Sequence, residues 1–204
     1  MVIKSNKSEI INQDMISISN ALINLKECFE GKKILVTGAA GFLGKYFVGL
    51  LSYLNKYILD NSVIVYAFDN YITGVNHEIK DNNIHFFNQD VTIPFEIDDE
   101  IDYIIHAAGI ASPLYYTKHP IETMDVSTIG TRNMLELAKQ KNVKGFLFTS
   151  SSEVYGDPPD KYIPTPETYN GNVSTIAPTS GFIVHGRIEI VAYVWYSNPD
   201  KPYT

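Results

Sequence analysis

Short apolar runs alternate with helical patterns along most of the chain. Five of these runs have the length and the β-branched or aromatic content of buried strands. They span residues 33–37, 62–68, 84–88, 101–106 and 145–150. Because the runs are apolar throughout instead of alternating with polar residues, we expect a parallel sheet that is covered on both faces.

Apolar residues at helical spacing occupy the segments around these runs. The pattern predicts helices over residues 15–29, 42–54, 128–141 and 183–196, with Asp14 as the cap and Gly31 as the end of the first. Strands that alternate with helices predict the α/β class, with a doubly wound parallel sheet of the Rossmann type. The chain ends at residues 201–204, where a sixth strand would begin, so we expect a sheet truncated there.

Composition and charge narrow the function classes. The 204 residues include 45% hydrophobic side chains and have a net charge of −7, with no basic run, which argues against a nucleic-acid partner. No apolar run approaches the roughly 18 residues that span a bilayer, and no signal peptide precedes the fold, so we expect a cytoplasmic protein without a membrane partner. A lone Cys28 and the absence of Cys/His clusters predict no disulfide and no metal site.

A glycine-rich turn follows the first predicted strand. Gly38, Gly41 and Gly44 form the pattern G-x-x-G-x-x-G between a strand and a helix. The first glycine permits a tight turn, the second lets the backbone approach a pyrophosphate, and the third lets the helix pack against the strand. The helix start, with Phe42 and Leu43, would offer free N–H groups to phosphates, so the pattern predicts a dinucleotide site.

Other small or acidic residues follow the second, third and fourth strands. Asp69 is placed to accept hydrogen bonds from ribose hydroxyls and to repel a 2′-phosphate, which favours NAD over NADP. Because the carboxyl ends of parallel strands share one edge, we expect these residues beside the glycine turn. The full set is Asp69, Asn70, Asp90, Val91, Ala107, Ala108 and Gly109.

These motifs, together with S-S-S-E-V-Y-G-D-P at residues 150–158, resemble the extended short-chain dehydrogenase/reductases. This family contains NAD-dependent nucleotide-sugar epimerases, dehydratases and decarboxylases. Four stretches are similar to its UDP-glucuronate decarboxylase branch: residues 69–74, 111–116, 128–135 and 151–173. The resemblance implies NAD as cofactor and a UDP-glucuronate-like nucleotide sugar as substrate.

The resemblance also implies roles for individual residues. In the family, C4 of the sugar is oxidised, the C5 carboxylate leaves as CO₂, and the ketone is reduced again. Ser152 would hydrogen-bond the C4 oxygen, and Glu153 would serve the decarboxylation step. Ser112, Pro113 and Tyr116 would help to hold the glucuronosyl group.

Two positions depart from the family. Its base is the Tyr of a Y-x-x-x-K pair, whose spacing puts both side chains on one helix face. In this chain Phe182 stands at the Tyr position and Gly186 at the Lys position, and none of the 14 tyrosines has a Lys four residues later. A phenylalanine has no hydroxyl to act as a base, so we expect impaired catalysis, since positioned acid–base groups contribute about 10²–10⁴-fold.

Three functions remain open from the sequence. The first is a nucleotide-sugar decarboxylase, or a related dehydratase or epimerase. The second is a non-catalytic NAD-binding subunit or fragment, which would form homo-oligomers or pair with a complete subunit. The third is a different chemistry, with Glu153 or His185 as the base. We expect an N-terminal helical extension over residues 1–30 and an NAD-binding Rossmann domain over residues 31–204, without a C-terminal substrate domain.

Overall fold

A computed structural model describes residues 7–73 and 79–171. In this part of the chain, five strands form one parallel sheet in the order β3-β2-β1-β4-β5. The strands are β1 (Lys33–Thr37), β2 (Ile64–Asp69), β3 (Ile84–Asn88), β4 (Tyr103–His106) and β5 (Gly145–Phe148). The predicted α/β class with a parallel, Rossmann-like sheet is confirmed, and the strand order reverses between β1 and β4.

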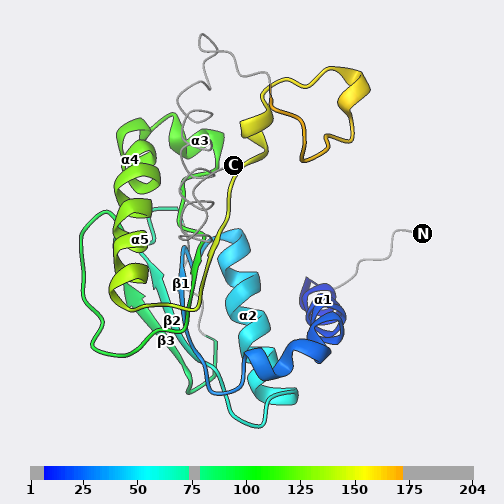
Figure 1. Cartoon of the computed structure of the whole chain (residues 1–204), viewed down its shortest axis with the longest axis vertical. Helices are drawn as coiled ribbons and strands as arrows, with labels where there is room; N and C mark the ends of the chain where they lie inside the picture. The colour runs from blue at the N-terminus through cyan, green and yellow to red at the C-terminus, as the bar shows by residue number, and fades with distance from the viewer. Residues whose placement is uncertain (1–6, 74–78, 172–204) are drawn as a thin grey trace.

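Helices cover both faces of the sheet (Figure 1). Helix α2 lies on one face, with α1 outside it, and α4 and α5 lie on the other face. The α-helices are α1 (Lys7–Leu22), α2 (Phe42–Tyr57), α3 (Pro113–Tyr116), α4 (Pro120–Asp125) and α5 (Thr131–Gln140). The shorter helical turns are η1 (Ile23–Cys28), η2 (Val126–Gly130), η3 (Ser152–Tyr155) and η4 (Asp160–Tyr162).

Helix α2 holds its face of the sheet through one apolar stripe. Val48, Leu51 and Leu54 recur at three-residue steps and are all buried. They pack against Ile34 and Val36 of β1, which point to this side of the sheet. A fully buried side chain of this size stabilises the fold by about 1.5–3 kcal/mol, so this stripe fixes α2 on β1.

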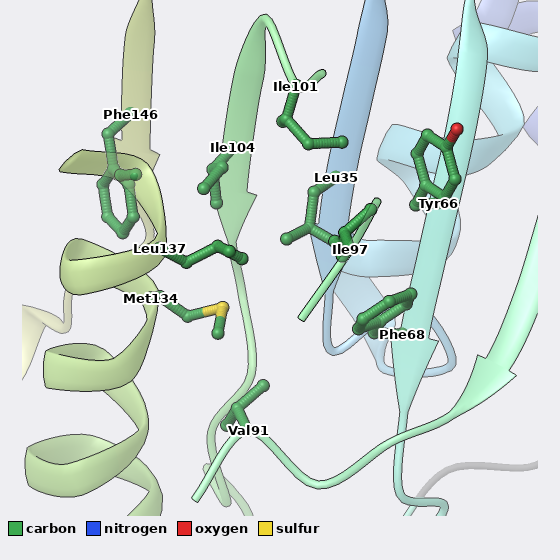
Figure 2. Close-up of a cluster of buried hydrophobic side chains, with 11 residues drawn as sticks. Leu35, Tyr66, Phe68, Val91, Ile97, Ile101, Ile104, Met134, Leu137 and Phe146 are labelled. Atoms are coloured by element: carbon green, nitrogen blue, oxygen red, sulfur yellow. The ribbon is translucent and has the colours of Figure 1, made fainter. Parts of the chain in front are cut away.

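A second apolar cluster lies between α5 and the opposite face (Figure 2). Met134 and Leu137 of α5 point toward Ile104 of β4. Below them, Val91 follows β3 and contacts the end of η2, where a Cβ on Gly130 would lie 2.8 Å from a Val91 methyl. The glycine therefore allows η2 to approach the loop after β3, which forms part of the site described below.

The N-terminal helix differs from the sequence prediction. Helix α1 starts at Lys7, and Asp14 lies inside it instead of capping it. The Asp14 carboxylate accepts a hydrogen bond of 2.9 Å from the hydroxyl of Tyr46 on α2, and Met15 is buried. This contact with α2 gives the polar first turns of α1 a tertiary partner, which the local pattern does not reveal. The predicted helix end at Gly31 is also wrong, because α1 ends at Leu22 and residues 23–28 form the 3-10 turn η1. Gly31, with φ of 64°, lies in the turn before β1.

Several boundaries also shift. The predicted helix 128–141 begins at Thr131, because residues 126–130 form the π-helical turn η2. The sequence pattern did not predict the short helices α3 and α4, which both begin with a proline. The predicted helix 183–196 and strand 201–204 lie outside the described residues. Within the described residues, no helix combines the length and apolar character that crossing a membrane requires.

Candidate functional site

A cleft opens at the carboxyl ends of β1, β2 and β4, where the strand order reverses. It encloses about 730 Å³ of empty space, part of which is open solvent. Nine of the residues predicted from the sequence line it together: Gly38, Gly41, Asp69, Asn70, Asp90, Val91, Ala107, Ala108 and Gly109. We call this hollow the switch-point cleft, after the position at which open α/β sheets bind ligands.

Close backbone contacts require glycine at two of the three positions of the pattern after β1. Gly38 has φ of 66°, and a Cβ there would lie 2.4 Å from the carbonyl oxygen of Ala107. A Cβ on Gly44 would lie 2.0 Å from the carbonyl oxygen of Gly38. Gly41 is the N-cap of α2 and lines the cleft. The first N–H groups of a helix have no partner within it, so the start of α2 presents donors and a partial positive charge suited to an anion.

The Asp69 carboxylate joins the end of β2 to the glycine turn. One oxygen accepts a hydrogen bond of 2.9 Å from the N–H of Ala40, and the other accepts one of 2.7 Å from the N–H of Tyr71. These two bonds fix the carboxylate in the wall of the switch-point cleft. An ionised carboxylate offers about four acceptor positions, so it retains capacity for hydroxyl donors from a ligand.

A second carboxylate, Asp90, lies on the wall after β3. Burial disfavours its charged form, but hydrogen bonds from Asn70 (3.0 Å) and from the N–H and hydroxyl of Thr92 (2.8 and 2.7 Å) outweigh that effect. The pKa of Asp90 is therefore lower than its usual value, and the side chain is ionised at neutral pH. The Asn70–Asp90 bond connects the ends of β2 and β3, so the two acidic walls are one polar unit.

Half of the residues that line the cleft were not predicted from the sequence. The additional residues are Phe68, Ile72, Thr73, Gln89, Thr92, Ile110, Glu122, Asp125 and Val126. Six of them lie within a few residues of predicted ones at the same strand ends, so their position in the sequence could have identified them. The other three come from α4 and η2, and no local pattern placed those elements beside the strand ends.

Other predicted residues lie outside the lining of the cleft. Phe42 and Leu43 lie on the first turn of α2, and their side chains are 77% and 48% exposed to solvent. Gly44 packs beneath the turn instead of facing the hollow. Ser112 precedes α3, and Pro113 and Tyr116 lie on that helix. Ser112, Pro113 and Tyr116 therefore form a group separate from the dinucleotide-type cleft.

The backbone locates the two catalytic residues that were predicted after β5. Ser152 and Glu153 begin η3, which follows the carboxyl end of β5 at the edge of the sheet that also carries the cleft. Phe182 and Gly186 lie outside the described residues. Among residues 7–73 and 79–171, no group of three or more His, Cys, Asp or Glu side chains is arranged to hold a metal ion.

The parallel sheet, its reversal between β1 and β4, and the glycine turn that opens α2 define a Rossmann-like α/β protein. Residues 34–189 match the NAD dependent epimerase/dehydratase family. The chain belongs to that family.

Comparison with individual proteins shows which members of the family the chain resembles. The chain is 42% identical over 159 residues to UDP-glucuronic acid decarboxylase 5 of Arabidopsis thaliana, covering 76% of this chain and 43% of that protein. It is 38% identical over 171 residues to UDP-glucuronic acid decarboxylase 1 of Xenopus tropicalis, covering 81% and 38%. A crystal structure of UDP-galactose 4-epimerase superposes with a TM-score of 0.67 at 28% identity, covering 81% and 52%. The chain thus spans about half or less of the length of these relatives.

Proposed function

We propose that the chain binds NAD in the switch-point cleft and takes part in the modification of a nucleotide sugar of the UDP-glucuronate class. The observation that carries this proposal is the meeting of the glycine turn and Asp69 in one cleft at the strand-order reversal. Membership of the NAD dependent epimerase/dehydratase family supports the cofactor. The similarity to UDP-glucuronic acid decarboxylases supports the substrate class.

The residues of the cleft fit a dinucleotide. The start of α2, capped by Gly41, suits a pyrophosphate, because its free N–H groups point along the helix axis. Asp69 suits the ribose hydroxyls, and its negative charge disfavours a 2′-phosphate. Ala107, Ala108 and Gly109 leave space for flat rings beside them. When bound, NAD would supply a reversible hydride acceptor for the sugar.

The sugar chemistry would fall to residues after β5. By the family resemblance, Ser152 would hold the C4 oxygen, and Glu153 would assist loss of the carboxylate. Tyr116 on α3, with Ser112 and Pro113, would contact the sugar. We expect slow turnover, because Phe182 and Gly186 stand where the family carries the Tyr and Lys that move the proton.

The second candidate is a non-catalytic NAD-binding subunit that associates with a second copy or with a complete relative. The substitution by Phe182 and Gly186 favours it, since it removes the base, whereas the glycine turn and Asp69 of the described cleft are present. Both candidates require NAD binding, and they differ in turnover.

The first experiment measures cofactor binding by isothermal titration with NAD⁺ and NADP⁺. We expect NAD⁺ to bind at least about tenfold more tightly than NADP⁺, because Asp69 repels the added phosphate. The Asp69→Asn variant removes that charge, and we expect it to reduce the ratio of NAD⁺ affinity to NADP⁺ affinity. Equal binding of both dinucleotides by the unaltered protein, or binding of neither, would refute the cofactor proposal.

The second experiment measures turnover. The protein is mixed with NAD⁺ and UDP-glucuronate, and the release of CO₂ and the formation of UDP-pentose are followed. The decarboxylase proposal predicts a rate about 10²–10⁴-fold below the common enzyme range of about 1–10³ per second. Binding of NAD⁺ with no turnover favours the non-catalytic subunit, and full enzyme rates would show that Phe182 and Gly186 do not impair the chain.

A further inference from the structure

One histidine is fully buried behind the switch-point cleft. His106 is the last residue of β4 and is only 1% exposed. Its two polar neighbours, Thr37 and Thr131, are 0% and 3% exposed. Thr37 ends β1, and Thr131 begins α5, so three elements that are far apart in sequence bring their polar groups together at this point.

The hydrogen bonds of this group define the state of the imidazole. Thr37 Oγ1 lies 2.6 Å from His106 Nδ1, and it also accepts a bond of 3.3 Å from the N–H of Ala108. Of these two partners, only the imidazole can accept the hydroxyl proton, so the arrangement that satisfies this proton within the group has Thr37 donating to Nδ1. The proton of a neutral imidazole then lies on Nε2, which is 3.3 Å from Thr131 Oγ1 and donates to it.

Two members of the group directly precede residues that line the switch-point cleft, and the third is connected to the cleft through η2. Thr37 precedes Gly38, and His106 precedes Ala107. These two walls are already so close that a Cβ on Gly38 would lie 2.4 Å from the carbonyl oxygen of Ala107. Thr131 follows η2, whose Val126 lines the cleft from the side of α4. A change in any one bond would therefore alter the spacing between walls.

We propose that His106 is a positioning residue: as a neutral imidazole protonated on Nε2, it ties the turn after β1, the loop after β4 and the start of α5 together, and so sets the width of the switch-point cleft. The inference deepens the proposed NAD-binding function and rests on it. The two threonines orient the ring. The ring in turn holds the Thr37 hydroxyl proton, so that a lone pair of Thr37 Oγ1 faces the Ala108 N–H. Burial lowers the pKa of His106 to about 3, so the ring stays neutral at physiological pH.

The test uses the whole chain with three variants. Thr37→Val removes the hydroxyl and keeps the shape, Thr37→Ser keeps the hydroxyl, and Val63→Ala is a control for general destabilisation at a buried site before β2. The measurements are NAD⁺ affinity by titration, hydrogen exchange of the Ala108 amide, and the ¹⁵N shifts of the His106 imidazole.

We expect Thr37→Val to weaken NAD⁺ binding about tenfold and to speed exchange of the Ala108 amide, because the buried His106 Nδ1 and the partly buried Ala108 N–H lose their shared partner. We expect Thr37→Ser to restore both values. Val63→Ala should lower thermal stability without changing either value. The imidazole shifts of the unaltered chain should report a neutral ring with the proton on Nε2.

Three outcomes would overturn the inference. They are unchanged NAD⁺ affinity and Ala108 exchange in Thr37→Val, failure of Thr37→Ser to restore them, and imidazole shifts of a charged or Nδ1-protonated ring. If the unaltered chain binds no NAD⁺, the proposed function fails. Ala108 exchange and the imidazole shifts then decide by themselves whether His106 holds the two loops together.

Discussion

Burial of His106 makes the stability of the fold sensitive to acid. The imidazole has a pKa near 6.5 in the unfolded chain, whereas burial lowers its pKa to about 3 in the folded one. Among residues 7–73 and 79–171, its side-chain partners are the hydroxyls of Thr37 and Thr131 and the rings of Phe146 and Phe148, none of which carries a charge. Between these two pKa values the unfolded chain binds one more proton than the folded chain, so the free energy of unfolding decreases as the pH falls.

The size of the effect follows from the two pKa values. His106 contributes its full share of stability above pH 6.5, and this share is lost at about 1.4 kcal/mol per pH unit as the pH falls from 6.5 toward 3. Between pH 7 and pH 4.5 the loss from this residue is about 2.5 kcal/mol. Most domains have a total stability of about 5–15 kcal/mol, so one buried histidine would remove a substantial part of it.

Urea unfolding followed by far-ultraviolet circular dichroism measures this loss. We compare the unaltered chain with His106→Phe at pH values from 4.5 to 7. The variant is less stable at neutral pH, because Thr37 and Thr131 lose a partner, but its free energy of unfolding should fall by about 2.5 kcal/mol less over this range. His85→Gln, which removes an exposed histidine, is the matched control.

The comparison of slopes separates His106 from the carboxylates. Asp90, Asp99 and Asp102 have lowered pKa values, and their protonation also destabilises the folded chain in acid. Their contribution is present in both proteins and cancels in the difference. If the two proteins lose the same free energy of unfolding between pH 7 and pH 4.5, His106 is not buried in the neutral form.

Three further predictions concern the cleft. Gly44→Ala should abolish NAD⁺ binding and lower the melting temperature, because its Cβ would lie 2.0 Å from a backbone carbonyl oxygen. As a control, Gly49→Ala should stabilise α2 by up to about 1 kcal/mol in urea unfolding, because its Cβ would meet no atom closer than the Met15 sulfur at 3.9 Å. Gly130→Ala should destabilise the fold through a 2.8 Å contact with Val91, and adding Val91→Ala should recover part of the loss in the same assay. Asp69→Asn should weaken NAD⁺ binding about tenfold in calorimetric titration, since an amide cannot accept both backbone N–H bonds.

Much of the sheet could be predicted because its strands carry their own signal. β1 and β3 begin and end at the predicted residues, and α2 begins at Phe42 as expected from the glycine turn before it. The errors occur where a distant contact decides the structure. Asp14 has the composition of a helix cap, yet its bond to Tyr46 of α2 stabilises a longer helix around it. Helices α3 and α4 are too short for a hydrophobic period to appear.

The residues of the cleft also fall into those that local sequence predicts and those that depend on distant contacts. Gly38 and Asp69 could be found from sequence because a tight turn and an acidic strand end require particular residue types at fixed places. Glu122 and Asp125, which also line the cleft, lie on an element whose position depends on packing. The His106 group was missed for a related reason. Its bonds join residues 69 and 25 positions apart, and no local pattern encodes such a pairing.

The proposed function assigns cofactor binding and sugar chemistry to different parts of this chain, and that separation has a physical consequence. The switch-point cleft is built from strand ends that the core holds from both faces, and all of the residues that form it here lie before residue 127. Phe182 and Gly186 lie outside the described residues. Replacing a base removes a proton-transfer contribution of about 10²–10⁴-fold from the rate, but it leaves backbone donors and the Asp69 carboxylate in place. Phe182→Tyr combined with Gly186→Lys should therefore raise turnover far more than NAD⁺ affinity. A large gain in affinity without a gain in rate would show instead that the lysine acts mainly on the cofactor.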